Sequence, residues 1–189
     1  LVEVNENEIL KTGTRKLIQK KIDGTVLSVV QGASAINNYG HWMMDIIPKL
    51  CITELHQSLN SFDAIYLPNY EKSFQIDSLK YFNVDFSKFI NGSQIRHVTA
   101  NKFVIPQHPY WKINKYQMET VANVDKDIVK NIRKKFLKNI ETNKFKKIFI
   151  DRSDSIFFHN QIENYDEVWE LLKKKNFTKL KLTNFTFKE

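Results

Sequence analysis

The feature of the sequence that most constrains its fold is an alternation of apolar, strand-like runs with segments of helical periodicity. The run "GTVLSVVQG" (residues 24–32) is β-branched, apolar and flanked by glycines, which is typical of a buried strand. Residues 39–57 predict a helix whose apolar side is formed by Trp42, Met43, Ile46, Ile47, Leu50 and Leu55. "DAIYLP" (residues 63–68) predicts a further strand that its proline ends. This order favours an α/β protein with a largely parallel sheet.

The same alternation continues along the chain, after residues 1–22, which we expect to form short strands or a hairpin. Helices are predicted over residues 74–82, 125–140 and 165–175, and strands over residues 102–106, 146–152 and 177–185. The strand–helix–strand order after residue 146 indicates a second α/β lobe that is only begun. We therefore expect an N-terminal α/β lobe over residues 1–122, a connecting helix with an incomplete C-terminal α/β lobe over residues 123–189, and a chain that is a fragment of a larger protein.

Composition narrows the class of protein. Of the 189 residues 42% are hydrophobic and 13% are aromatic, which indicates a folded chain and excludes a disordered one. No apolar run is long enough for a transmembrane helix, and the first ten residues lack the build of a signal peptide. The single cysteine, Cys51, excludes an internal disulfide and a cysteine-based zinc cluster. We expect a cytoplasmic protein, including a peripheral position at the cytoplasmic membrane.

The formal net charge of +8 leaves two interpretations open. A basic chain can bind nucleic acid, anionic lipid or phosphorylated small molecules. Alternatively, the charge reflects a lysine-rich composition spread over exposed positions.

The least ordinary segment is "NNYGHWMMDIIPKL" (residues 37–50). His41 and Asp45 are four residues apart, so they share one side of a helix, and Asn38 is placed to cap that helix or to join the same polar cluster. One interpretation is a site in a cleft, where the histidine accepts a proton or donates a hydrogen bond and the acid orients it. The other is a local His–Asp pair with an N-cap, with Trp42 and Ile46 in the core. A metal site is disfavoured, since this spacing supplies only two ligands.

Pro48 lies inside the helix that this segment predicts. A proline removes one helical hydrogen bond and clashes with the carbonyl four residues earlier, which here belongs to Met44. We therefore expect a kink about one turn after Asp45.

A second candidate site is the loop "DRSDSIFFHNQIEN" (residues 151–164). Arg152 follows the predicted strand at its carboxyl end, where open α/β sheets bind ligands. The next helix begins with Asn164 as N-cap and Glu167 at the capping-box position. An arginine facing a helix N-terminus suits a phosphate or diphosphate, whereas the alternative is that Arg152 pairs with a neighbouring aspartate and Asn164 only caps. No glycine-rich dinucleotide motif and no P-loop motif occurs.

The segment "RHVTANKFVIPQHPYW" (residues 96–111) places two histidines, an arginine and three aromatic residues around a predicted strand end. Such a set can line a site for a sugar or another ring-shaped ligand. It can equally form an ordinary packed loop, which is the interpretation we favour.

Taken in order, these segments resemble glycosyltransferase family 61, which includes many bacterial capsular-polysaccharide biosynthesis proteins. "NYGHWMMDIIPKL" is similar to the family's Asn-Tyr-x-His-Trp followed by Asp, Pro and Leu, and "IFIDR" to its strand ending in Ser-Arg, with Asp151 in place of the serine. "ENYDEVWELLKKKNF" is similar to its Asn-Glu-x-Glu helix, and "LTNFTFKE" to its Leu-x-x-Phe-x-x-Glu segment. The resemblance covers residues 24–189. Where the family usually has a second arginine in the loop, this chain has His159.

The resemblance implies a GT-B-like fold, with a Rossmann-like N-terminal lobe and the first βαβ part of a second Rossmann-like lobe. It implies transfer of a sugar from a nucleotide-sugar donor, held mainly by the C-terminal lobe, to a glycan acceptor, with inversion at the anomeric carbon. We expect His41 and Asp45 to be catalytic. Substrate-binding roles are expected for Asn38, Trp42, Arg152, His159 and Asn164. No cofactor and no metal is expected.

A rival interpretation comes from a different class of protein. The basic charge, with aromatic residues interleaved between lysines, also suits a non-catalytic module that binds anions, with nucleic acid as its ligand. The glycosyltransferase hypothesis expects no nucleic-acid partner.

Overall fold

The computed structural model describes residues 19–30, 38–107, 126–138, 147–154 and 162–187. The chain divides into two compact units, Leu1–Arg133 and Lys134–Glu189, and the division falls inside helix α5 (Lys126–Phe136). The predicted lobe boundary, between residues 122 and 123, lies outside the described residues. Each unit is treated by itself below.

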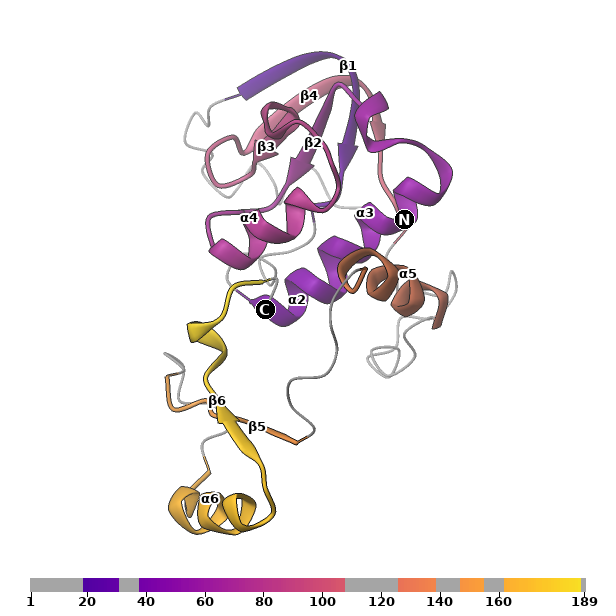
Figure 1. Cartoon of the computed structure of the whole chain (residues 1–189). Helices are drawn as coiled ribbons and strands as arrows, with labels where there is room; N and C mark the ends of the chain where they lie inside the picture. Colours follow the sequence, from indigo (N-terminus) through magenta and orange to yellow (C-terminus); the bar gives the residue numbers. More distant parts are fainter. Residues whose placement is uncertain (1–18, 31–37, 108–125, 139–146, 155–161, 188–189) are drawn as a thin grey trace, which may run out of the picture. The chain divides into compact units, whose positions relative to one another are not determined.

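A four-stranded parallel sheet forms the centre of the first unit (Figure 1). Its strands lie in the order β3-β2-β1-β4, and every neighbouring pair is parallel. The strands are β1 (Gln19–Ser28), β2 (Ala64–Leu67), β3 (Phe89–Asn91) and β4 (His97–Val104). The predicted α/β class with a parallel sheet is therefore confirmed.

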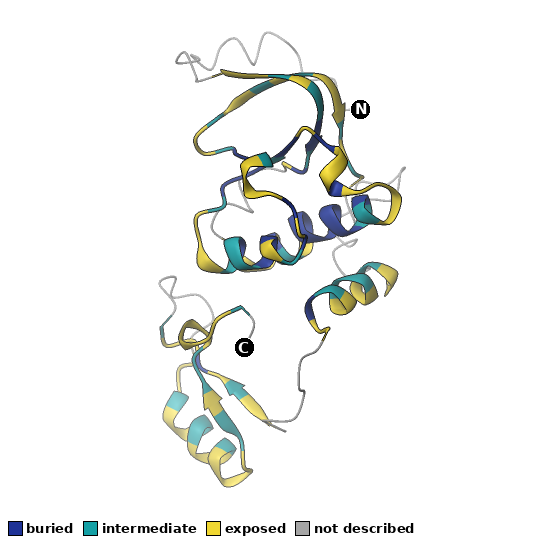
Figure 2. Ribbon diagram, turned by 45° about the horizontal axis from the view of Figure 1, so that its top comes forward, coloured by how far each residue is buried: buried dark blue, intermediate teal, exposed yellow. Residues whose placement is uncertain are grey.

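The helices of this unit follow the strands, as in other α/β folds. After β1 the chain forms one helical segment in three parts, and after β2 it forms α4. The parts are α2 (Tyr39–His41), the π-helical turn η2 (Trp42–Ile46) and α3 (Ile47–His56), and α4 spans Ser73–Lys80. Figures 1 and 2 show α3 and α4 on the same face of the sheet. Within the described part of the chain, no helix is both long enough and apolar enough to cross a bilayer.

The core of the first unit lies between this face of the sheet and the helices. Fully buried apolar side chains come from β1 and β2, from the long helical segment and from α4: Leu27, Ile65, Leu67, Trp42, Ile46, Ile47, Leu50 and Leu79. Val26, the strand neighbour of Leu27, packs instead in a separate cluster with Ala64 and Ile90. The predicted apolar side of the helix is thus correct for four of its residues. It is wrong for Leu55, which is 61% exposed. Leu55 follows Leu50 by five residues, and in a helix with 3.6 residues per turn this spacing places its side chain outside the buried face.

A β-bulge in β1 explains why residue 24 is a glycine. The pairing of β1 with β4 shifts register between Ile22 and Thr25, and Gly24 lies inside this shift. The carboxylate of Asp63 lies against Gly24, so an added Cβ would be only 2.1 Å from Oδ2 of Asp63. The same Oδ2 accepts a hydrogen bond from the backbone N–H of Thr25 at 2.7 Å. A side chain at position 24 would therefore displace a bonded carboxylate.

The second unit contains a short strand–helix–strand element, as predicted. Strands β5 (Ile148–Ile150) and β6 (Thr178–Leu180) are parallel, and α6 (Tyr165–Lys174) connects them. The ring of Phe149 stacks on that of Trp169, with centroids 6.0 Å apart, so strand and helix pack through aromatic side chains. The strand predicted over residues 177–185 is too long, because β6 ends at Leu180 and a 3-10 turn (Leu182–Asn184) follows.

Candidate functional site

The first candidate site lies where the helices of the first unit begin. In a parallel sheet the strands end at one common edge, and the helices that follow them start there, which is where open α/β sheets bind ligands. The ring of Tyr39, at the start of α2, contacts the ring of Phe74, at the start of α4, with centroids 5.2 Å apart. The N-terminal turns of α2 and α4 are therefore neighbours at this edge.

Asn38 caps the first of these helices. Its side-chain Oδ1 accepts a hydrogen bond from the backbone N–H of His41 at 3.1 Å, and its backbone carbonyl accepts one from Trp42 at 2.9 Å. The predicted capping role is therefore confirmed. Asn38 is itself exposed, and its predicted contact with substrate stays a prediction.

His41 and Asp45 form the central pair of this site. Nδ1 of His41 lies 2.9 Å from Oδ2 of Asp45; the histidine side chain is 49% exposed and that of the aspartate only 7%. An ionised carboxylate can only accept hydrogen bonds, so with Asp45 ionised Nδ1 is the donor of this contact, and in a neutral ring Nε2 is then the nitrogen that carries the lone pair. The predicted pairing is thus present, and the ring is half-exposed.

A π-helical turn carries this pair. The backbone N–H of Ile47 donates to the carbonyl of Trp42, five residues earlier, and Pro48 follows at the start of α3. The wider turn accommodates the ring of the proline and its missing N–H. The distortion thus differs from the expected kink one turn after Asp45: it is a π-helical turn that precedes the proline and contains Asp45.

Trp42 lies in the core. Its side chain is completely buried, and its Nε1–H donates to Oγ of Ser78 in α4 at 2.9 Å. The Ser78 hydroxyl in turn donates to the backbone carbonyl of Gln75 at 2.9 Å. A ring without exposed surface cannot touch a bound sugar, so the expected substrate contact of Trp42 is corrected to a packing role next to His41.

Lys49 is a residue of this segment that the sequence analysis did not select. It is only 5% exposed and lies one turn after Asp45. Burial lowers the pKa of the Lys49 amine, and the Asp45 carboxylate opposes that shift. The four-residue spacing from Asp45 was a visible signal. A lysine between apolar residues is nevertheless usually read as exposed.

The second candidate site follows strand β5. Arg152 is exposed and comes two residues after the end of β5, at the carboxyl end of the strand as predicted. Among the described residues it forms no ion pair with either neighbouring aspartate: the carboxylate of Asp151 accepts from the backbone N–H of Ser153 at 2.9 Å, and that of Asp154 contacts the Thr183 hydroxyl. The alternative in which Arg152 is neutralised locally is therefore not observed.

Lys181 is a second cation at this edge. β6 is parallel to β5 and ends at Leu180, so Lys181 follows the carboxyl end of the neighbouring strand. Asp151, the residue before Arg152, is buried. Burial acts to raise the pKa of its carboxyl, but the hydrogen bond from Ser153, the nearby Tyr165 hydroxyl and the charge of Lys181 together lower it. The sequence analysis missed Lys181 because the predicted strand ran past it.

Asn164 occupies the N-cap position of α6, but its side chain makes no capping bond to the backbone. Its Nδ2 donates instead to Oε2 of Glu167 at 3.2 Å, so the predicted capping box is not formed. The first turn of α6 carries Asp166 and Glu167, whose negative charges stabilise the helix but oppose an anion at its N-terminus. Side-chain cations are thus better placed than the helix N-terminus to bind phosphate. His159 lies outside the described residues.

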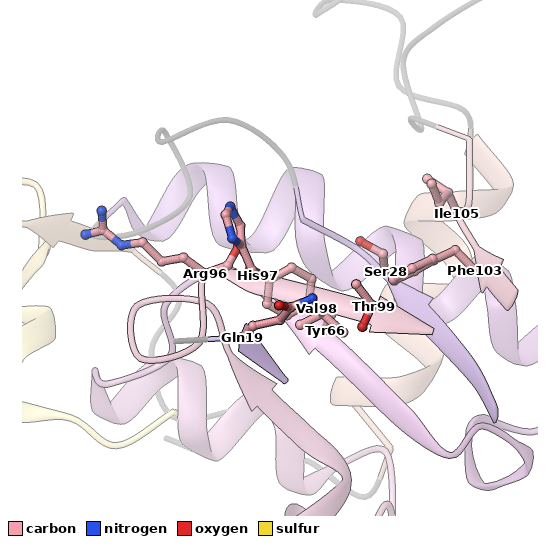
Figure 3. A pocket seen from close by; sticks show the side chains of 9 residues that line it. All are labelled: Gln19, Ser28, Tyr66, Arg96, His97, Val98, Thr99, Phe103 and Ile105. Atoms are coloured by element: carbon pink, nitrogen blue, oxygen red, sulfur yellow. The ribbon is translucent and has the colours of Figure 1, made fainter. Parts of the chain in front are cut away.

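The segment over residues 96–111 is mostly strand where it is described. Residues 97–104 form β4, and residues 108–111 lie outside the described residues. A cavity of about 510 Å³ lies over β1 and β4, and Figure 3 shows that the guanidinium of Arg96 points away from the other lining side chains. The Tyr66 hydroxyl, at the centre of this view, donates to the backbone carbonyl of Ile95 at 3.0 Å. Sugar binding here stays an untested alternative.

The described residues contain no group of three or more His, Cys, Asp or Glu side chains that could hold a metal ion.

The first unit is thus a parallel α/β unit with a His–Asp pair near the start of its first helix, and the second is a strand–helix–strand unit with an exposed arginine after β5, so both units are of the α/β class. The family model for glycosyltransferase 61 matches residues 39–189, from the first residue of α2 to the end of the sequence. The chain therefore belongs to the glycosyltransferase 61 family, and its general activity is sugar transfer. No curated protein and no solved structure gave a significant match.

Proposed function

We propose that this chain transfers a sugar from a nucleotide-sugar donor to a hydroxyl of a glycan acceptor, with His41 as the proton acceptor. Family membership gives the general activity. The observation that carries the finer proposal is the 2.9 Å contact between Nδ1 of His41 and Oδ2 of Asp45, in which Nε2 of the half-exposed ring takes no part.

The acceptor half of the reaction uses this pair. Nε2 of His41 takes the proton of the acceptor hydroxyl while its oxygen attacks the anomeric carbon of the donor sugar. The bond from the anomeric carbon to the phosphate oxygen breaks, and its electron pair leaves with the nucleoside diphosphate. Asp45 stabilises the imidazolium that forms, as a carboxylate does for a histidine base. A single displacement of this kind inverts the configuration at the anomeric carbon.

The donor half needs positive charge near the departing diphosphate. Arg152 and Lys181 follow neighbouring parallel strands, and we assign this role to them. Arg152 can bind phosphate oxygens in a bidentate manner. The acidic first turn of α6 supports side-chain cations over the helix N-terminus as the source of this charge. Asn164 and His159 retain their predicted roles as donor contacts.

The rest of the proposal follows from the resemblance to glycosyltransferase family 61. We place the reaction in surface or capsular polysaccharide biosynthesis, at the cytoplasmic side of the membrane, within a GT-B arrangement of two lobes. The rival hypothesis, a basic module for nucleic acid, is supported by the net charge of +8 and by the aromatic residues interleaved between lysines.

Calorimetric titration distinguishes the glycosyltransferase proposal from the nucleic-acid hypothesis. The ligands are a panel of nucleoside mono- and diphosphates and a single-stranded oligonucleotide, each at low and moderate salt. The glycosyltransferase proposal expects saturable binding of one nucleoside diphosphate at both salt levels. Binding of the oligonucleotide alone, falling steeply as salt is raised, would contradict it. Arg152→Gln should weaken diphosphate binding about tenfold, as expected for a lost charged hydrogen bond. Arg133→Gln, at another exposed arginine, is the matched control.

A further inference from the structure

Helix α5 (Lys126–Phe136) carries a concentration of positive charge that neither candidate site uses. Residues 126–138 contain six lysines and arginines and a single acid, Asp127. The described residues outside this segment contain 15 lysines and arginines and 13 acids, so their charges nearly balance. Within the described part of the chain, most of the excess positive charge therefore lies on this one segment.

The cations of α5 occupy one side of the helix. An α-helix turns by about 100° per residue, so the side chains of Lys126, Lys130, Arg133 and Lys134 lie within an arc of about 100°. We call this arc the cationic side of α5, and all four of its side chains are exposed. Nζ of Lys130 lies 2.8 Å from Oδ1 of Asp127, and an exposed ion pair of this kind is weak. The other three form no ion pair among the described residues.

The apolar side of α5 is turned the other way. Ile128, Ile132 and Phe136 follow one another at intervals of four residues, which places them roughly opposite the cationic side. The two isoleucines are partly buried, and Phe136 is only 7% exposed. The ring of Phe136 contacts that of Phe187, with centroids 5.2 Å apart. The helix therefore packs through its apolar side and leaves its cationic side in solvent.

Aliphatic side chains are exposed beside the cations. Val129 lies at the edge of the cationic side, about 40° from Arg133, and is 40% exposed. Leu137, directly after the helix, is 43% exposed. Helices that lie on membranes combine such groups, because cations reach anionic headgroups while aliphatic chains enter the layer beneath them. Surfaces for single-stranded nucleic acid use aromatic rings that stack on bases, and the one ring of α5, that of Phe136, is on the buried side.

We infer that the cationic side of α5 binds the surface of an anionic lipid bilayer and holds the chain there. The charge of this side is complementary to anionic headgroups, and each lysine or arginine close to such a surface strengthens binding about fivefold. The inference goes beyond the proposed reaction, because α5 contributes no residue to either candidate site. It assigns to one helix the membrane contact that the proposed place of the reaction requires.

The test is cosedimentation of the full chain with lipid vesicles. One set of vesicles contains phosphatidylcholine with about one third phosphatidylglycerol, and the other contains phosphatidylcholine alone. We expect the parent protein to bind the anionic vesicles, more weakly as salt is raised, and not to bind the neutral ones. The triple variant Lys126→Gln, Lys130→Gln and Lys134→Gln should bind the anionic vesicles about a hundredfold more weakly.

The matched control removes the same charge elsewhere. Lys173→Gln with Lys174→Gln and Lys175→Gln changes three exposed lysines at the end of α6 and should alter vesicle affinity by less than about threefold. Replacing the three α5 lysines by arginine keeps their charge and should keep the affinity of the parent. Glutamine is a good helix former and the three α5 positions are exposed, so the unfolding transition should stay where it is in the parent.

Equal weakening by the two glutamine triples would show that only net charge matters and would overturn the inference. Equal binding to anionic and neutral vesicles would overturn it as well, and so would loss of binding in the arginine triple. A chain that binds a single-stranded oligonucleotide through α5 but binds no vesicles would assign this surface to nucleic acid instead. Vesicle binding is measured without donor or acceptor. A chain that binds vesicles through α5 and transfers no sugar therefore contradicts the proposed function alone.

Discussion

Nε1 of Trp42 lies 2.9 Å from Oγ of Ser78, and both side chains are completely buried. The two residues are 36 positions apart in the sequence, so this bond fastens the π-helical turn to α4. Trp42 directly follows His41, and the bond therefore fixes the part of the helix from which the proposed base projects. The same serine donates to the carbonyl of Gln75, which ties the contact into the backbone of α4.

We expect Trp42→Phe to lower the free energy of unfolding by about 2–3 kcal/mol, since it removes this hydrogen bond and leaves a small cavity. Ser78→Ala should cost about 1 kcal/mol. The double variant should be more stable than the sum of the two losses predicts, by about 1 kcal/mol, because each single change already removes the shared bond. Urea denaturation followed by circular dichroism gives all three values. Leu55→Ala, at an exposed position of the same helix, should change stability by less than about 0.5 kcal/mol, and strictly additive losses would contradict a direct coupling.

The proposed base is tested by His41→Gln. The amide cannot accept and hold a proton, so we expect sugar transfer to fall by about two to four orders of magnitude, while the unfolding transition stays within about 1 kcal/mol of the parent. The rate is measured as nucleoside diphosphate released from the donor that binds in the titration above. His56→Gln changes an exposed histidine at the other end of the same helical segment and should leave the rate unaltered. Equal rates for His41→Gln and the parent would assign His41 a structural role only.

The contribution of Lys49 to the free energy of unfolding should depend on pH. Burial holds its pKa below the usual value of 10.5, so between the lowered pKa and 10.5 the folded chain binds fewer protons at this site than the unfolded chain. Stability contributed by Lys49 therefore rises with pH in this window. The free energy of unfolding of the parent, relative to Lys49→Met, should increase as the pH is raised toward 10.5. Denaturation of both proteins at several alkaline pH values measures this difference, and other lysines cancel because both proteins contain them. A difference that stays constant or decreases would show that Lys49 is not desolvated.

The sequence predicted those parts of the fold that depend on local pattern. The β-branched run around Val26 and the spacing of Trp42, Ile46 and Leu50 located a strand and the helix packed on it. The start of β4 was missed because this edge strand is largely exposed and carries polar residues such as His97 and Asn101. β3 was missed because three residues are too short to show alternation.

At the site, a spacing of four residues was enough to predict the contact between His41 and Asp45. It was not enough to tell a buried residue from an exposed one: Trp42 is completely buried, and so, further along the same segment, is most of Lys49, where an exposed lysine would be expected. Burial depends on packing against α4 and the sheet, which is determined by residues distant in sequence. The π-helical turn was likewise invisible, because one proline is compatible with several local distortions.

Gly24 provides the sharpest test of the fold around β1. A Cβ at this position would lie 2.1 Å from Oδ2 and 2.5 Å from Cγ of Asp63, distances that no relaxed structure contains. In Gly24→Ala the Asp63 side chain must therefore move and lose its 2.7 Å bond to the N–H of Thr25. We expect a loss of about 2–3 kcal/mol in the free energy of unfolding, from the steric displacement and an unsatisfied backbone donor together. Asp63→Ala alone should cost about 1 kcal/mol, because it loses the bond without a clash.

The decisive protein is the double variant Gly24→Ala with Asp63→Ala. Once the carboxylate is gone the added methyl group has room, so adding Gly24→Ala to Asp63→Ala should cost much less than adding it to the parent, by at least about 1 kcal/mol. Gly40→Ala is a useful comparison, because a Cβ there would approach only Oδ1 of the exposed Asn38, at 3.2 Å, and should be tolerated better. If Gly24→Ala costs the same with and without the carboxylate, its effect arises from the backbone of the bulge and not from Asp63.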